Sequence, residues 1–244
     1  MHGQSVPLAA GPMNALPANV PRAMTTLQSI QAESTTGVGS RAPRPRVRQL
    51  GLSDYVQCWH AMRGFTSSRT EATPDEIWVL EHHPVYTLGV AGRSEHLPRV
   101  SSPIPVVRVD RGGQITYHGP GQVVIYLLLD MRRRGLTVRP LVRIMERAVI
   151  NLLAHYGLAA EGRTNAPGVY VEGSKIAALG LRVKNGCCYH GIAFNVDMDL
   201  APFHAIDPCG YPGLAVTQAR DLGITAPAKR LGEELSEQLL ELLP

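Results

Sequence analysis

The stretch SKIAALGLRVKNGCCYHGIAFN, residues 174–195, carries the strongest fold signal in this sequence. The dipeptide Asn185-Gly186 near its centre is typical of the two-residue type I′ turn that joins two antiparallel strands. This turn pairs Lys184 with Cys187 and sets the register of every pair beyond them. The sequence therefore predicts a long β-hairpin.

The predicted register brings small residues together in the middle of the hairpin. The facing pairs are Gly180 with Gly191, Leu179 with Ile192, and Ala178 with Ala193. Two opposed glycines flanked by alanines leave a flat surface that a ligand or another chain can approach closely. The alternative is that the glycines only relieve crowding against a helix. Lys175 falls at the far end of the hairpin, near Val196.

The rest of the body, residues 46–244, is expected to form one α/β domain with a mixed sheet, hairpins and flanking helices, without internal repeats. Strands are predicted at 77–80, 85–88, 106–109 and 123–129, and helices at 140–156, at 231–240 and from an N-cap at Ser53. Gly157 suits a left-handed helix C-cap. Residues 1–45 are rich in Pro, Gly, Ser and Thr and have no apolar period, so a disordered N-terminal extension is expected there.

The composition excludes several protein classes. Hydrophobic residues make up 44% and charged residues 18% of the chain, and the longest apolar run is 123–129, so a transmembrane protein is not expected. Four cysteines are too few for a disulfide scaffold, and a cytoplasmic location follows from that. The net charge of +4 and the 5% of aromatic residues do not suit a nucleic-acid binder.

The densest basic patch is expected to be either a small face for an acidic protein partner or ordinary solvated surface. It comprises Arg132, Arg133, Arg134, Arg139 and Arg143.

A glycine-rich segment, RGGQITYHGPGQ at 111–122, is expected to be a loop between two strands. Its glycines allow backbone N–H groups to converge on an oxygen atom, and Arg111 and His118 flank it as polar anchors. The nearby Gly173-Ser-Lys175 only imitates a phosphate-binding loop, because its residue order is wrong and a strand follows it.

Cys209, between Pro208 and Gly210, is the candidate nucleophile. A nucleophilic thiol needs a lowered pKa, which a neighbouring cation can supply. Lys175, His204 and His118 are the candidates, and spacing does not choose among them. A zinc site at Cys187, Cys188 and His190 is disfavoured, because adjacent residues of a strand point to opposite faces.

Three segments in order resemble the octanoyltransferases of lipoate biosynthesis, also called the lipoate-protein ligase B family. They are RGGQITYHGPGQVVIYLLLD, GSKIAALGLRV with HGIAFNVDMDL, and PCG; EHHPVYTLG at 81–89 also matches. The resemblance covers about residues 50–222. It implies the biotin/lipoate protein ligase-like fold for a catalytic domain spanning 46–244.

The resemblance also implies site residues. Cys209 and Lys175 would form a catalytic dyad, with Cys209 as the nucleophile. The implied substrate-binding residues are Arg111, Gly112, Gly113, Gln114, Ile115, Thr116, Tyr117, His118, Ala178, Leu179, Gly180, Gly191, Ile192 and Ala193. Of these, residues 178–180 and 191–193 face each other in the register predicted from the turn.

The implied activity moves octanoate from octanoyl-acyl carrier protein to a lysine of a lipoyl domain, the first step of endogenous protein lipoylation. The lipoyl domains would be those of the 2-oxoacid dehydrogenase complexes and of the glycine cleavage H protein. No cofactor, ATP or metal is expected, because one thioester is exchanged for another. No nucleic acid or membrane partner is expected. The protein is expected to be a monomer.

Two alternatives remain at this point. An ATP-dependent lipoate or biotin ligase would need no catalytic cysteine, so Cys209 speaks against it. A non-catalytic carrier-protein binding module would not need both Cys209 and Lys175.

Overall fold

The computed structural model describes residues 42–100, 102–164, 166–207 and 213–244, and these residues belong to one compact unit. The predicted extension lies outside the described residues except for 42–45. There the carbonyl of Pro43 accepts a hydrogen bond from Arg134 Nη2 at 2.6 Å, and Arg44 pairs with Glu237.

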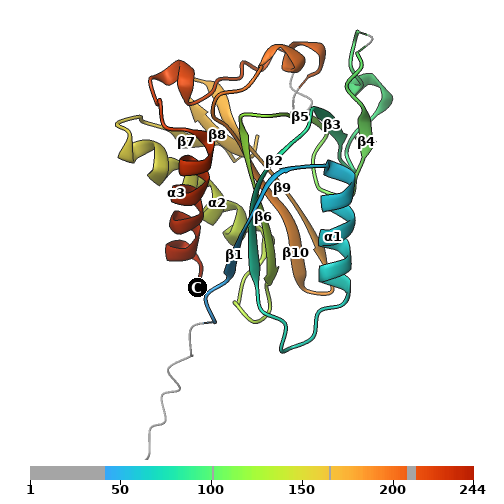
Figure 1. Ribbon diagram of the computed structural model, residues 1–244, viewed down its shortest axis with the longest axis vertical. Helices are drawn as coiled ribbons and strands as arrows, with labels where there is room; N and C mark the ends of the chain where they lie inside the picture. Colours follow the sequence, from blue (N-terminus) through green and yellow to red (C-terminus); the bar gives the residue numbers. More distant parts are fainter. Residues whose placement is uncertain (1–41, 101, 165, 208–212) are drawn as a thin grey trace, which may run out of the picture. The chain divides into compact units, whose positions relative to one another are not determined.

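A seven-stranded mixed sheet forms the centre of the fold (Figure 1). In spatial order its strands are β1 (Arg46–Ser53), β2 (Glu76–His82), β6 (Gln122–Asp130), β10 (Cys187–Asn195), β9 (Ser174–Lys184), β8 (Gly168–Val171) and β7 (Glu161–Gly162). A second sheet has the order β4 (Val106–Arg108), β3 (Val85–Leu88) and β5 (Ile115–His118). Only the β1–β2 and β3–β4 pairs are parallel among these strands. The predicted mixed α/β architecture is confirmed.

The hairpin of β9 and β10 has the predicted register. Lys184 pairs with Cys187, Gly180 with Gly191 and Ala178 with Ala193. Asn185 and Gly186 both have positive φ, 52° and 76°, as a type I′ turn requires. A local turn signal was therefore sufficient to place residues on opposite strands.

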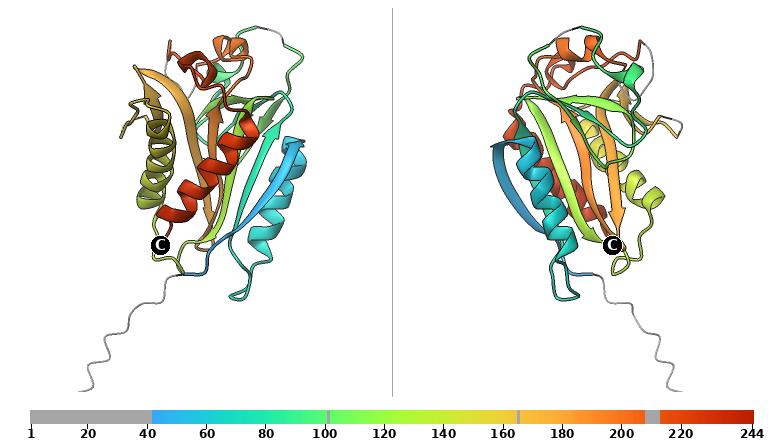
Figure 2. Two further views of the ribbon diagram at one scale, coloured as in Figure 1. Left: turned by 60° about the vertical axis from the view of Figure 1, so that its left-hand side comes forward. Right: turned by 90° about the vertical axis from the view of Figure 1, so that its right-hand side faces the viewer.

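Helices cover both faces of the large sheet (Figure 2). Helix α1 (Tyr55–Ser67) lies on one face, and α2 (Val138–His155) and α3 (Ala228–Leu242) lie on the other. The described chain also contains the short 3-10 helices η1 (Ser94–His96), η2 (Ala201–Ala205) and η4 (Arg220–Leu222). None of its helices is long and apolar enough to cross a membrane.

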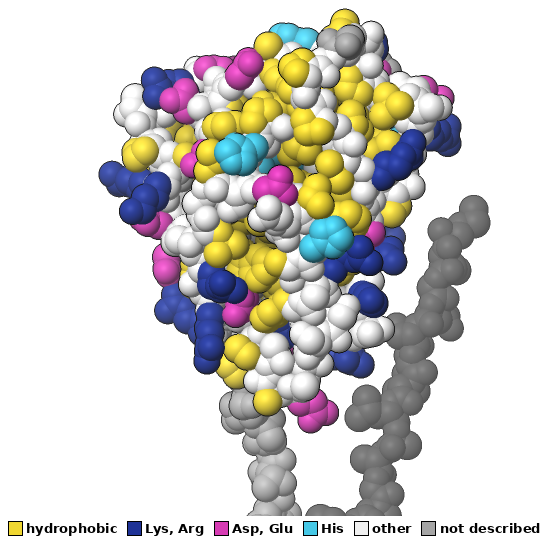
Figure 3. All heavy atoms as spheres, turned by 45° about the vertical axis from the view of Figure 1, so that its right-hand side comes forward, with side chains coloured by type: hydrophobic (Ala, Val, Ile, Leu, Met, Phe, Trp, Pro, Cys, Tyr) yellow, Lys and Arg dark blue, Asp and Glu magenta, His cyan; other side chains and the backbone are white. Residues whose placement is uncertain are grey.

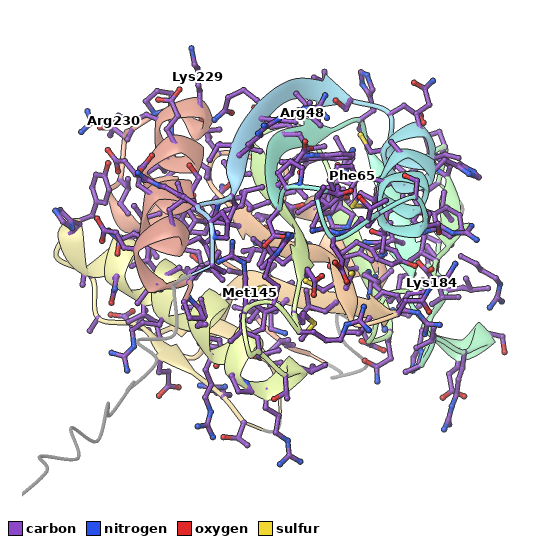
Figure 4. The ribbon with its side chains drawn as sticks, turned by 90° about the horizontal axis from the view of Figure 1, so that it is seen from below. Arg48, Phe65, Met145, Lys184, Lys229 and Arg230 are labelled. Atoms are coloured by element: carbon purple, nitrogen blue, oxygen red, sulfur yellow. The ribbon has the colours of Figure 1, made fainter. Side chains whose placement is uncertain are left out.

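Because successive side chains of a strand point to opposite faces of the sheet, the core consists of one layer on each face. Alternate β6 residues Val123, Ile125 and Leu127 face α2 and α3, while Val124 and Tyr126 face α1. Leu231, Leu235 and Leu239 of α3 are fully buried, which confirms the predicted apolar stripe. In Figure 4, Met145 lies on the inner side of α2, whereas Lys229 and Arg230 point outward from α3.

Several local predictions were wrong. Helix α1 is capped by Asp54, whose carboxylate accepts from Gln57 N at 2.9 Å, and Ser53 ends β1 instead. Strand β1 was missed because most of its residues are exposed on both faces, so it shows no apolar alternation. Residues 115–118 form β5 rather than part of a loop.

The predicted basic patch is only partly on the surface: Arg132, Arg139 and Arg143 are exposed, whereas Arg133 is half-buried and Arg134 is buried. Arg134 is buried and donates to Asp75 Oδ2 at 2.6 Å, while Arg133 donates to Asp75 Oδ1 at 2.8 Å. Arg69 reaches the same carboxylate at 2.5 Å. Burial alone would raise the pKa of Asp75, but hydrogen bonds from the Asp130 backbone and the arginines lower it. Arg134 is therefore engaged inside the fold, and the exposed arginines still allow either a partner face or ordinary solvated surface.

Candidate active site

The segment 111–114 is held by close backbone approach to residues 89–91. Gly89 N donates to Gln114 O at 2.9 Å, and Ala91 N donates to Gly113 O at 3.1 Å. A Cβ at Gly89 would lie 2.3 Å from Gly113 O, so only glycine permits this approach. Gly113 itself has a φ of +86°.

Strand β5 continues this segment and divides its side chains between two environments. Tyr117 packs in an apolar cluster that includes Tyr86 and Phe203, and its ring lies 5.5 Å from that of Phe203. Thr116 and His118 face a pocket instead. The flanking glycines concealed this strand in the sequence, because they suggested a continuous loop.

The pocket lies against the α1 face of the large sheet and, with its open mouth, holds about 500 Å³. Its lining residues are Tyr55, Arg111, Gly112, Gly113, Gln114, Ile115, Thr116, His118, Val124, Tyr126, Ala178, Leu179, Gly180, His190, Gly191, Ile192 and Ala193. All the predicted substrate-binding residues except Tyr117 are among them. Figure 3 shows a face of the molecule where hydrophobic side chains gather among histidines, with Lys and Arg toward its edges.

Sequence reasoning missed four of the lining residues: Tyr55, Val124, Tyr126 and His190. Val124 and Tyr126 lie on a strand that was predicted, and His190 lies in the quoted HGIA segment. The strand period of two could have assigned these side chains to one face. Tyr55 comes from the predicted apolar face of α1, and only packing shows that this face reaches the pocket.

The two opposed glycines of the hairpin have different neighbours. A Cβ at Gly180 would lie 3.2 Å from Arg111 Cδ, so the arginine stem packs on this position. A Cβ at Gly191 would lie 2.2 Å from Ile125 O of the neighbouring strand. The predicted close approach therefore exists. Arg111 and Gly112 pack on Gly180, and the backbone of β6 packs on Gly191. Both glycines also line the pocket.

Arg111 is held in one orientation. Its Nη2 donates to Thr87 O at 2.6 Å and to Thr87 Oγ1 at 2.8 Å, and its Nη1 donates to Gly112 O at 2.9 Å. Thr87 Oγ1 also lies 3.2 Å from His118 Nε2. Since Thr87 accepts from Arg111, its own proton points to the imidazole.

His118 is neutral in this arrangement. Burial and the neighbouring His82 lower the pKa of His118 well below its usual value. Its Nδ1 lies 2.7 Å from Gln122 Oε1, so Nδ1 carries the proton and donates. Gln122 Nε2 donates in turn to Asn195 Oδ1 at 2.9 Å. His118 thus has partners on both ring nitrogens and has no spare position for a thiol.

Lys175 lies on β9 in a small cavity that shares Thr116 and Ala178 with the pocket. The side chain is 3% exposed, Nζ lies 3.3 Å from Pro167 O, and it lies 5.3 Å from the centre of the Tyr170 ring. Gly168, with φ of +151°, makes room for it, because a Cβ there would lie 2.9 Å from Lys175 Cε.

The backbone of Lys175 is clamped by the segment 215–217. Lys175 N donates to Ala215 O at 2.8 Å, and Thr217 N donates to Lys175 O at 2.9 Å. Asn195 Nδ2 holds the same segment through Thr217 O at 3.0 Å. The chain of hydrogen bonds from Arg111 through His118, Gln122 and Asn195 therefore reaches the strand position of Lys175.

Cys209 lies outside the described residues, together with Pro208 and Gly210. The expected approach of its thiol to Lys175 remains a prediction. His204, the third candidate neighbour, is exposed in η2. Cys187 and Cys188 are buried, and the described residues contain no group of three His, Cys, Asp or Glu side chains arranged to hold a metal ion.

The chain is similar in sequence to proteins of known family. The family model described as the lipoyl protein ligase A/B catalytic domain matches residues 54–239. An octanoyltransferase from Azoarcus sp. (strain BH72) is 62% identical over 81% of this chain and 87% of its own length. An octanoyltransferase from Nitrosospira multiformis is 63% identical over 79% of this chain and 89% of its own length.

Solved structures show the same fold at low identity. Lipoate-protein ligase A bound with ATP superposes with a TM-score of 0.66 at 16% identity, covering 82% of this chain and 85% of that one. A bipartite lipoate protein ligase from Thermoplasma acidophilum, solved in a study with its E2 lipoyl domain, gives 0.63 at 17% identity, covering 82% and 83%. The chain therefore belongs to the lipoyl protein ligase A/B catalytic-domain family and, within it, to the octanoyltransferases, which are acyltransferases.

Proposed function

We propose that this protein transfers an octanoyl group from an acyl carrier protein to the target lysine of a lipoyl domain through a thioester on Cys209. The observation that supports this best is the position of Lys175, buried in a cavity that shares Thr116 and Ala178 with the larger, mostly apolar pocket. A buried amine beside the acyl group can move protons without competition from bulk water.

In the first step the Cys209 thiolate attacks the carbonyl carbon of the carrier thioester. The new C–S bond forms, the C–S bond to the carrier's thiol breaks, and the Lys175 ammonium gives its proton to the departing thiolate. Lys175 is then a neutral amine beside an acyl-enzyme. Exchange of one thioester for another is nearly isoenergetic, so this step requires neither ATP nor a metal.

In the second step the neutral amine of the lipoyl-domain lysine attacks the acyl-enzyme. The C–N bond forms, the C–S bond to Cys209 breaks, and Lys175 takes the proton that the attacking nitrogen loses. The thiolate–ammonium pair is restored. Formation of an amide from a thioester is downhill, which makes the transfer directional. The proposed acceptors are the lipoyl domains of 2-oxoacid dehydrogenase complexes and the glycine cleavage H protein.

The protein's contribution is positioning. Three clamps fix the elements around the acyl group: the 111–114 segment on residues 89–91, the Arg111 fork on Thr87, and the 215–217 segment on Lys175. Reacting groups held in one geometry need not be ordered again in the transition state.

The test is intact-protein mass spectrometry after mixing with octanoyl-carrier protein without ATP. We expect a mass increase of one octanoyl group that hydroxylamine removes and that is lost in Cys209→Ser. Lys175→Ala should lose transfer to a lipoyl domain while its circular dichroism spectrum is kept. Lys184→Ala, an exposed lysine on the same strand, is the matched control and should stay active.

Three results would contradict the proposal. Octanoylation that occurs only with free octanoate and ATP would indicate a ligase. Binding of the carrier protein without any covalent adduct would indicate a binding module. Full activity of Lys175→Ala would remove that residue from the reaction.

A further inference from the structure

Tyr170 and Lys175 face each other across two neighbouring strands. The turn between β8 and β9 has two central residues, Glu172 and Gly173, and both have positive φ, 47° and 83°, as in a type I′ turn. This turn pairs Tyr170 with Lys175. Directly opposed residues of a strand pair project from the same face of the sheet, so the turn places the tyrosine ring beside the lysine side chain.

A register shift follows this pair. Val169 pairs with Ala177, so Ile176 is an extra residue in β9. Ile176 and Ala177 are both buried in the cluster that packs on α2 and α3. An extra residue of this kind changes the direction of the side chains beside it. It lets β9 enter the core while Lys175 keeps the partner that the turn gives it.

The lysine nitrogen lies against two groups that favour a positive charge. Lys175 Nζ is 5.3 Å from the centre of the Tyr170 ring and 3.3 Å from Pro167 O. A cation within about 6 Å of an aromatic ring centre is attracted by the negative face of the ring. Lys175 is 3% exposed and Tyr170 is fully buried, so water screens this attraction little. Taking an ammonium ion out of water is costly, and these contacts offset part of the cost.

The Tyr170 ring is itself held in place. Its hydroxyl donates to Ala166 O at 2.8 Å, in the segment that also supplies the carbonyl contact to the lysine. Arg163 also contacts the ring, with Cζ 4.2 Å from the ring centre. Glu161 accepts from that guanidinium at 2.9 Å and compensates its charge. This ion pair limits the repulsion between the two cations that share the ring.

We propose that Tyr170 is a positioning residue that keeps Lys175 in its ammonium form before acyl transfer. This inference rests on the proposed function, in which the Lys175 ammonium pairs with the Cys209 thiolate. A ring that stabilises the ammonium ion stabilises this pair over the neutral amine and thiol, and so it raises the fraction of thiolate. A purely structural role would depend on the shape of the ring and not on its charge distribution.

The experiment changes the charge distribution of the ring while nearly keeping its shape. Tyr170→Phe is compared, in the full chain, with phenylalanine analogues at position 170 that carry one, two or three fluorine atoms. One readout is the rate of acyl-enzyme formation with octanoyl-carrier protein. The other is the rate of Cys209 alkylation by iodoacetamide at pH 7, because the thiolate is the reactive form. Peptide mass spectrometry separates Cys209 from the other thiols, whose pKa burial raises: Cys58, Cys187 and Cys188.

We expect both rates to follow the charge on the ring face. Tyr170→Phe should stay within about threefold of wild type, because the ring remains and only the hydrogen bond to Ala166 is lost. Both rates should then fall with each fluorine atom, since fluorine withdraws charge from the ring face. Three fluorine atoms should lower both about tenfold relative to Tyr170→Phe.

The same fluorinated series at Phe65 is the matched control. Arg69 Cζ lies 5.3 Å from the centre of that ring, the same distance as for Lys175 and Tyr170. Phe65 lines neither the pocket nor the Lys175 cavity, so both rates should stay at the wild-type value. An equal loss in the Phe65 series would overturn the inference. So would a trifluorinated ring at position 170 that leaves both rates within twofold of Tyr170→Phe.

The alkylation rate separates this inference from the proposed chemistry. An alkylation rate that falls with fluorination supports the role of Tyr170 even if octanoyl-carrier protein leaves no acyl-enzyme, a result that would contradict the proposed function alone. An enzyme that forms the acyl-enzyme but whose alkylation rate does not change with fluorination overturns the role of Tyr170 alone.

Discussion

Alanine at Gly191 and at Gly180 should have opposite consequences, although these glycines face each other in one hairpin. At Gly191 the new Cβ would lie 2.2 Å from Ile125 O, a backbone atom of the central strand β6. At Gly180 the nearest atom is Arg111 Cδ at 3.2 Å, which belongs to a side chain. A backbone atom in a paired strand cannot move aside alone, whereas a side chain can.

The expected magnitudes follow from these contacts. Overpacking a rigid core costs about 1–3 kcal/mol. Separating β10 from β6 around Gly191 also weakens ladder hydrogen bonds worth about 1 kcal/mol each. We therefore expect Gly191→Ala to lower the free energy of unfolding by about 3 kcal/mol or more, and Tm by about 6–12 °C for a domain of this size. Gly180→Ala should cost less than about 1 kcal/mol.

Gly180→Ala should affect activity more than stability. Gly180→Ala pushes the stem of Arg111 and with it the 111–114 segment that lines the pocket. A displacement of about 1 Å at a reacting centre can cost about a hundredfold in rate. Because the 3.2 Å contact requires a shift of only a few tenths of an ångström, we expect Gly180→Ala to lose a few-fold in kcat/KM while remaining folded.

The assays are urea denaturation followed by circular dichroism, and octanoyl transfer at a temperature where each variant is folded. A Gly191→Ala variant within 1 kcal/mol of wild type would refute the reasoning from the Ile125 contact. A fully active Gly180→Ala variant would refute the role assigned to the Arg111 stem.

Two further predictions concern buried charge. Asp75→Asn should lower the free energy of unfolding by about 3–5 kcal/mol, because it leaves the buried Arg69 and Arg134 without their carboxylate; urea denaturation measures this. The exposed Glu95→Gln is its control and should cost less than about 1 kcal/mol, and equal losses in the two variants would contradict the assignment. Burial lowers the pKa of His82 to about 4, against 6.5 for an ordinary histidine, so between these values the unfolded chain binds more protons than the folded one. The free energy of unfolding should therefore fall as the pH drops from 7 to 4, and this residue should account for about 3 kcal/mol of that loss. The difference in free energy of unfolding between wild type and His82→Gln should shrink over the same pH range. A difference that stays constant would show that His82 does not titrate as stated.

The sequence by itself determined the features that depend on local chemistry. The Asn185-Gly186 turn sets the hairpin register, because φ values above zero are accessible to these two residues. The 3.6-residue period of α3 predicted which leucines are buried. The motifs around Lys175 and Cys209 indicated the family, since they lie in continuous segments.

Only the tertiary structure decided the features that join distant segments. Nothing local in Arg134 distinguishes it from an exposed arginine; its burial depends on Asp75 of another strand. Strand β5 exists because Val85 to Leu88 supply its partner, and glycines on both sides of it conceal that in the sequence. Tyr55 reaches the pocket because α1 packs on the sheet. Register is a local property of a turn, whereas the walls of a pocket come from segments that meet only when the chain is folded.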